Sequence, residues 1–154
     1  LYLGGTASDF AIVEAFVGLG MLLGTATVYK IGHRFNHGAL FLLGLFIDGA
    51  SFCLYYFVET MSQLNFLSCI HGIGIPFLII SRVSIMQKNI PEKLLGRIFA
   101  IISVSILSMT AVSSGIIGFL AEFISIHEIF LLFGLLAGLC GIAGLLHPKI
   151  RYLN

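Results

Sequence analysis

The chain is organised as five long apolar runs separated by short polar links. Each run holds about 20 mostly apolar residues, the length that a helix needs to cross the hydrocarbon core of a bilayer. The runs are continuously apolar rather than alternating, which argues against the strands of a membrane barrel. The pattern therefore predicts five transmembrane helices, at about residues 10–29, 38–58, 64–86, 98–120 and 127–146.

The polar links between these runs leave no room for a soluble domain. They cover residues 30–37, 59–63, 87–97 and 121–126. Because short links place consecutive helices side by side in opposite directions, we expect an antiparallel bundle. The predicted fold is thus an all-α, polytopic membrane protein that forms one bundle over residues 1–154.

The basic residues fall on or near one side of this bundle. Seven of the eight lie in the first link, the third link and the tail: Lys30, Arg34, Lys88, Lys93, Arg97, Lys149 and Arg151. Loops rich in Lys and Arg stay in the cytoplasm. We therefore expect these links and the C-terminus to be cytoplasmic, in a multi-pass protein of the cell (inner) membrane. Residue 1 then lies outside without a signal peptide, which we interpret as a sign that upstream helices are missing.

Composition narrows the class of protein further. Hydrophobic residues make up 58% and charged residues 10%, with a mean hydropathy of +1.08, whereas a soluble domain is about 25% charged. The bilayer must therefore replace water around most side chains. A net charge of +1 gives no reason to expect a nucleic-acid partner. We see no metal-ligand spacing, cofactor motif or nucleophile–base pair, so we expect no metal, no cofactor and no enzymatic activity.

Glycines at helical spacing predict close contacts between helices. Gly20 and Gly24 lie in the first run, and the last run repeats small residues at positions 134, 138, 141 and 144. Small residues at this spacing let helix backbones approach in lipid.

Two cytoplasmic links carry motifs. The first contains Lys30, Gly32 and Arg34, and the third reads Ile-Pro-Glu-Lys-Leu-Leu-Gly-Arg-Ile-Phe-Ala over residues 90–100. In this order they resemble the major facilitator superfamily. Its signature link between the second and third helices of each half is G-x-x-x-D-[RK]-x-G-[RK]-[RK]. Tyr29 stands where the Asp belongs, and His33 replaces one basic residue.

The third link resembles the one before the fifth helix of a half, as in the exporters of drugs, siderophores and macrolides. That branch continues P-L-G-x-x-x-x-G-x-L-A-D, which Gly118, Leu120 and Ala121 match and from which Ala111, Ser113 and Glu122 depart. The resemblance implies helices eight to twelve, most of the C-terminal six-helix half, with the N-terminal half of the transporter as a missing partner. It also implies a gating role for Lys30, Gly32, Arg34, Gly96 and Arg97.

Four ionisable residues fall inside the predicted membrane spans, where such residues default to functional hypotheses. Asp48 and His71 differ in depth by only about 5 Å at the rise of an α-helix. A contact between them has two interpretations, a titrating pair for proton coupling or a structural hydrogen bond between packed helices. The resemblance places Asp48 on a peripheral ninth helix, which favours the structural interpretation.

Glu14 and Arg82 are the other two. The resemblance places Glu14 on an eighth helix that lines the transport cavity, where it would bind a cation or relay protons. The alternative is an interfacial carboxylate in contact with outer water. Arg82 lies near the cytoplasmic end of its helix, and we expect it to extend toward the cytoplasm.

The fourth run is rich in hydroxyl groups, and Pro76 interrupts the third. Ser108 and Thr110 are candidates to bind substrate, because the resemblance makes this an eleventh, cavity-facing helix. Alternatively, such hydroxyls bond back to their own helix. Pro76 predicts a kink or a loosened segment.

These observations predict a fragment of a secondary active transporter. It would export an amphipathic small molecule by alternating access, as a proton-coupled efflux antiporter in the lipid bilayer. The alternative is a non-transporting accessory or assembly subunit that binds another bundle through its glycine faces.

Overall fold

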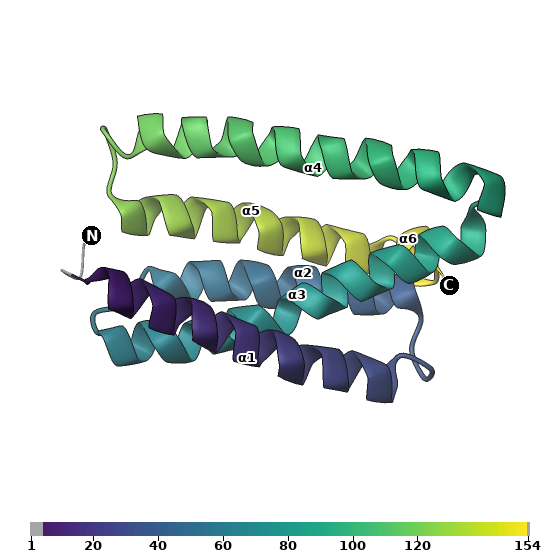
Figure 1. Ribbon diagram of the computed structural model, residues 1–154, viewed down its shortest axis with the longest axis horizontal. Helices are drawn as coiled ribbons and strands as arrows, with labels where there is room; N and C mark the ends of the chain where they lie inside the picture. Colours follow the sequence, from purple (N-terminus) through teal and green to yellow (C-terminus); the bar gives the residue numbers. More distant parts are fainter. Residues whose placement is uncertain (1–4, 154) are drawn as a thin grey trace.

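The computed structural model describes residues 5–153, which form a bundle of helices (Figure 1). The long helices are α1 (Ala7–Ile31), α2 (His37–Tyr55), α3 (Met61–Asn89), α4 (Glu92–Leu120) and α5 (Ile126–Leu146), followed by one short turn, α6 (Pro148–Arg151). Each long helix is long and apolar enough to cross a membrane. The prediction of an all-α antiparallel bundle with five transmembrane helices is confirmed.

Helix ends differ from those expected from apolarity alone, most of all at the third link. Instead of an extended connection over 87–97, α3 continues to Asn89 and α4 begins at Glu92. Pro91 is the N-cap residue and Glu92 lies in the first turn, where a carboxylate suits the positive end of the helix dipole. Charged residues at both ends are therefore helical, and an apolarity pattern cannot detect them.

Three helices begin with a capping box at the end of the bundle that holds the acidic residues. In each, the N-cap hydroxyl accepts a hydrogen bond from the backbone N–H three residues later, and the side chain of that later residue accepts one from the N-cap N–H. The pairs are Thr6–Asp9, Thr60–Gln63 and Ser125–Glu128. Two of the acidic residues on this side therefore satisfy the first N–H groups of helices.

α1 crosses α3 at a contact made by glycine. A Cβ at Gly20 would collide with the carbonyl oxygen of Cys69, and one at Gly24 with that of Ile73. From the other side, a Cβ at Gly72 would strike the carbonyl of Val17. The absence of side chains here lets the two backbones touch.

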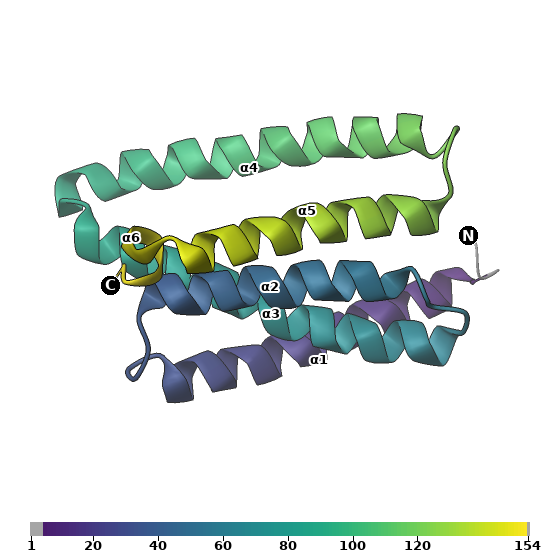
Figure 2. The ribbon, with the colours of Figure 1, turned by 180° about the vertical axis from the view of Figure 1, so that it is seen from behind.

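α2 lies between α3 and α5, and both contacts again depend on glycine (Figure 2). A Cβ at Gly134 would meet the backbone of Cys53, and one at Gly49 would meet the backbone of Gly138. A Cβ at Gly44 would press on Phe77, which belongs to the small apolar core together with Val28 and Leu40. These contacts hold α1, α2, α3 and α5 in one packed unit.

α3 runs unbroken through Pro76, whose ring lies buried in the bundle. Proline has no N–H to donate to the carbonyl four residues earlier. The helix changes direction beyond its middle and leads toward α4 (Figure 1).

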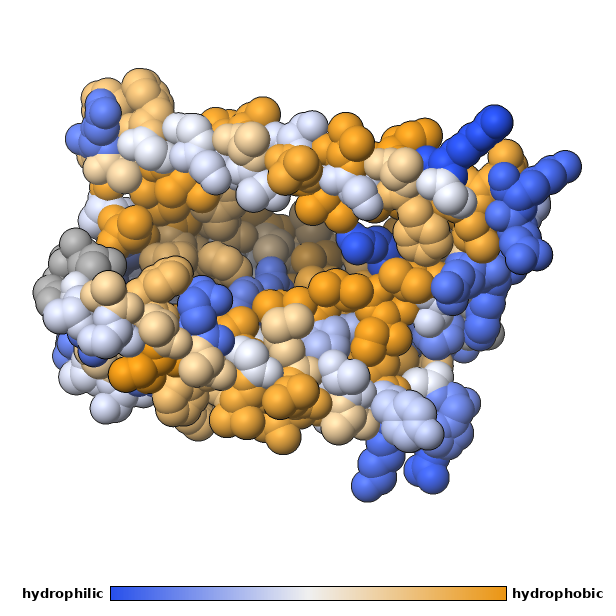
Figure 3. Space-filling view, in the orientation of Figure 1, coloured by the Kyte–Doolittle hydropathy of each residue, from blue (hydrophilic) through white to orange (hydrophobic). Residues whose placement is uncertain are grey.

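α4 stands apart from this unit. None of its 29 residues is buried, and it contacts the bundle mainly next to its junction with α3. A furrow separates it from the helices beside it (Figure 3). Gly115 and Gly118 have no atom near the position of a Cβ.

Hydrophilic side chains gather at one end of the molecule (Figure 3). The α1–α2 link, the α3–α4 link and the C-terminal segment lie at this end (Figure 1). The backbone joins the segments there, since the Gly38 N–H donates to the Leu153 carbonyl at 2.8 Å. We call this the basic end.

Candidate functional site

The structure brings Asp48 of α2 and His71 of α3 together between the ends of the bundle. Nδ1 of His71 lies 3.1 Å from Oδ1 of Asp48, and the two side chains are 19% and 22% exposed. This is ion-pairing distance, although the direction of approach at Nδ1 does not meet hydrogen-bond geometry. The contact is an ion pair only when His71 carries a proton.

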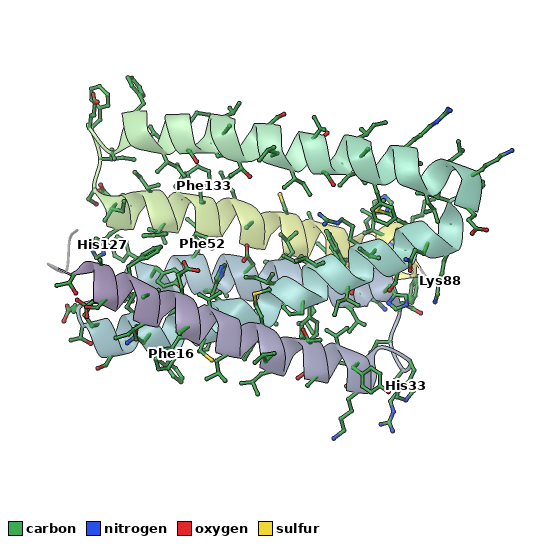
Figure 4. The ribbon with its side chains drawn as sticks, viewed as in Figure 1. Phe16, His33, Phe52, Lys88, His127 and Phe133 are labelled. Atoms are coloured by element: carbon green, nitrogen blue, oxygen red, sulfur yellow. The ribbon has the colours of Figure 1, made fainter. Side chains whose placement is uncertain are left out.

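Aromatic rings surround the imidazole. The Phe52 ring meets His71 edge-on with centroids 5.2 Å apart, and Tyr55 lies 6.4 Å from it. Phe130 of α5 packs against both rings, at 5.7 Å from Phe52 and 5.3 Å from Tyr55. Figure 4 shows Phe52 in this part of the bundle. The Asp48–His71 contact therefore lies where α2, α3 and α5 meet.

A hydroxyl pair extends the polar contacts by one turn. The Tyr55 hydroxyl lies 3.1 Å from Oγ of Ser68, which is almost fully buried. Ser68 precedes His71 by three residues on α3, so both lie on the same face. Sequence reasoning missed this pair and the aromatic rings, although the spacing of Phe52, Tyr55, Ser68 and His71 on two adjacent helices is a usable signal.

Next to this cluster, an apolar cavity of about 290 Å³ opens at the end of the bundle where α1, α3 and α5 begin. Tyr55 and Phe130 belong both to the cluster and to the lining of the cavity, which also includes Asp9 and His127. Nδ1 of His127 lies 2.9 Å from the Tyr56 carbonyl, which fixes the ring at the start of α5.

Glu14 and Arg82 lie outside this cluster. Glu14 is exposed on α1, and Arg82 is half-buried on α3. Neither pairs with an opposite charge among residues 5–153.

Three of the six hydroxyls of α4 bond to their own helix. Thr110 donates to the Ile106 carbonyl at 2.9 Å, and Ser105 and Ser114 do the same one turn back. Within the described part of the chain, Ser108 makes no hydrogen bond through its exposed hydroxyl. Of the two substrate candidates on α4, only Ser108 has an uncommitted donor.

The link residues occupy the basic end. Lys30 and Arg34 are exposed, and Gly32 ends α1, donating to the Val28 carbonyl at 2.7 Å. Gly96 and Arg97 lie inside the first turns of α4 rather than in a loop, and both are exposed. The two links therefore share one end of the molecule.

Over residues 5–153, His, Cys, Asp and Glu nowhere gather in a group of three that could hold a metal ion. The arrangement offers instead a carboxylate and an imidazole in contact, each partly exposed. Such a pair can hold or release a proton while its net charge changes by one unit.

Comparison with known proteins identifies the family. The family model described as Major Facilitator Superfamily matches residues 1–151, almost the whole chain. No curated protein and no solved structure matches. Members of this family are membrane transporters, in agreement with the five membrane-spanning helices and the basic links. The chain belongs to the major facilitator superfamily.

Proposed function

We propose that this chain forms helices eight to twelve of a proton-coupled exporter of amphipathic small molecules, an antiporter that works by alternating access. Family membership supports transport across a membrane. The observation that carries the proposal of proton coupling is the 3.1 Å approach of His71 to Asp48 inside the bundle.

The pair would bind the coupling proton. An ionised Asp48 beside a neutral His71 gains a proton on the ring, and the resulting ion pair is stabilised at this distance in a low dielectric. Release of that proton would restore the net charge of the pair to one negative unit. Both side chains are partly exposed, and proton exchange would take place through water that reaches this exposed surface.

The isolated face of α4 would line the transport path. A helix with no buried residue, facing a furrow, is suited to border a route completed by further helices. The link residues Lys30, Gly32, Arg34, Gly96 and Arg97 would act at the cytoplasmic gate, with the basic end and the C-terminus in the cytoplasm.

An accessory subunit is the second candidate. It would use glycine faces to bind another bundle, and Gly115 and Gly118 on α4 are open for this. Gly20, Gly24, Gly49, Gly72 and Gly134 are instead occupied by contacts within the bundle. Most of the glycine surface that this function would need is therefore already used.

The test of function is transport by two preparations in proteoliposomes with an acidic lumen. The transporter that contains this chain together with an N-terminal half is expected to move an amphipathic fluorescent dye into the lumen, driven by the pH gradient. The 154-residue chain alone is expected to move none, because it supplies one side of the path. Dye transport by the chain alone would contradict the proposal, and so would a pH-insensitive whole protein.

Ser108→Ala and Thr110→Val form a matched pair on α4. Removing the uncommitted Ser108 hydroxyl is expected to weaken dye binding about fivefold, the equivalent of one hydrogen bond of about 1 kcal/mol. Thr110→Val is expected to change it little, because the hydroxyl already bonds to the Ile106 carbonyl. Dye affinity measured by fluorescence quenching in the whole transporter distinguishes the two. Equal effects would remove Ser108 from the binding face.

A further inference from the structure

A polar cavity opens at the basic end, between the α1–α2 link and the end of α3. Its volume is about 510 Å³. The link contributes His33, Arg34, Asn36 and His37, and α3 contributes Lys88. Figure 4 shows His33 and Lys88 at this end of the molecule. The lining of this cavity does not include Asp48 or His71.

The lining is basic. Arg34 and Lys88 carry permanent positive charge, and the described lining includes no carboxylate. Neither cation forms an ion pair among residues 5–153. Nε of Arg34 donates to Nε2 of His33 at 3.3 Å. This bond uses one N–H of the guanidinium and leaves the others available. Two separate elements thus present unpaired cations to one space, an arrangement that favours an anion.

His37 adds an unsatisfied donor or acceptor. Its Nδ1 is buried and has no hydrogen-bond partner in the described structure. His37 is also the first residue of the 19-residue helix α2, whose N-cap residue Asn36 makes no side-chain cap. At the start of that helix the Gly38 N–H already donates to the Leu153 carbonyl. A buried polar atom without a partner is costly, and a turn of the His37 ring toward the cavity would let a ligand oxygen satisfy it.

Flanking aromatic side chains place the cavity at the membrane surface. Tyr29 is 88% exposed at the end of α1, and Phe35 in the lining is 56% exposed. Aromatic rings at the ends of membrane-spanning helices lie at the level of the lipid headgroups. A ligand with an anionic group for the cavity and an apolar part for these rings has the composition of a phospholipid.

We propose that this cavity binds the phosphate of an anionic phospholipid in the leaflet at the basic end. The Arg34 guanidinium suits two phosphate oxygens at once, and Lys88 supplies a second charge from the facing helix. The unpartnered His37 nitrogen would hold a further oxygen.

The experiment measures lipid selectivity with the full 154-residue chain in phosphatidylcholine nanodiscs. Electron spin resonance gives the immobilised fraction of spin-labelled phosphatidylglycerol, and of spin-labelled phosphatidylcholine as the neutral reference. The wild-type chain is expected to prefer phosphatidylglycerol. Arg34→Gln and Lys88→Gln are each expected to lower that preference by up to about fivefold, the contribution of one basic residue near a charged membrane surface.

The control is the double variant Lys93→Gln/Arg97→Gln, which removes two charges at the same end but outside the cavity. It is expected to keep the preference, while Arg34→Gln/Lys88→Gln loses it, with helical content by circular dichroism unchanged in both. Equal losses in the two double variants would overturn the proposal in favour of a diffuse surface charge. No lipid preference in the wild type would overturn it too, as would binding of inorganic phosphate alone in the same discs.

Discussion

Replacing Asp48 by Asn is expected to abolish proton-driven accumulation of dye in the whole transporter. The amide cannot take part in the exchange of charge with His71 at 3.1 Å. One exchanged proton sustains about a tenfold solute gradient for each pH unit, since a pH unit is worth about 1.4 kcal/mol. The Asp48→Asn protein is expected to sustain none, although it still equilibrates dye down its own gradient.

Dye accumulation in proteoliposomes at several imposed pH gradients measures this directly. His71→Gln is expected to behave like Asp48→Asn, and the double variant no worse than either, because the two groups act as a unit. Glu59→Gln, an exposed carboxylate in the α2–α3 link, serves as the control and is expected to retain coupling. If Asp48→Asn accumulates dye as the wild type does, the pair is a structural contact between packed helices.

The largest expected effect on stability comes from Gly20→Leu. Any side chain at this position must enter the backbone of α3 at the Cys69 carbonyl and the Gly72 Cα. Backbone cannot yield as the far end of a side chain can, so α1 has to separate from α3. We expect a loss of about 3 kcal/mol, the upper range for overpacking in a close contact, measured by SDS titration of the chain in detergent micelles.

Gly18→Leu is the matched control two residues earlier. It adds the same atoms to the same helix, but no atom lies within 4 Å of its Cβ position. Its unfolding midpoint is expected to stay close to that of the wild type. Equal destabilisation by the two variants would contradict the close α1–α3 contact as the cause, because leucine has the higher helix propensity and would by itself stabilise both helices.

Much of the fold follows from the sequence because the bilayer imposes it. Five apolar runs and the short links between them determine the number and order of the helices and their antiparallel arrangement. Helix ends do not follow from apolarity, since they depend on hydrogen bonds at Thr6, Thr60 and Ser125 and on the dipole at Glu92. The spacing of a capping box, Ser or Thr followed three residues later by an acidic or amide residue, is nevertheless visible in the sequence.

The site was harder to predict than the fold. Depth along two helices suggests that Asp48 and His71 lie at similar levels, but only the rotation of α2 against α3 brings them into contact. That rotation is set by glycines such as Gly44 and Gly74 at the interface. The ring of Phe130 arrives from α5, so its place beside Phe52 and Tyr55 depends on a contact between helices far apart in sequence.

The isolation of α4 also has no clear signature in the sequence. Its run is richer in hydroxyls than the packed helices, with six Ser and Thr residues, but that composition does not predict that none of its residues is buried. Whether a face contacts protein or lipid is decided by complementary surfaces elsewhere, because lipid chains are as apolar as leucine.

The central claim is that substrate and proton move in opposite directions through the protein that contains this chain. Proteoliposomes loaded with a pH-sensitive dye, with equal pH on both sides and a gradient of amphipathic substrate, test it directly. We predict that substrate moving down its gradient drives protons across the membrane in the opposite direction. The Asp48→Asn protein is expected to move substrate without a change in lumenal pH. Substrate movement in the wild type with no change in lumenal pH would contradict it.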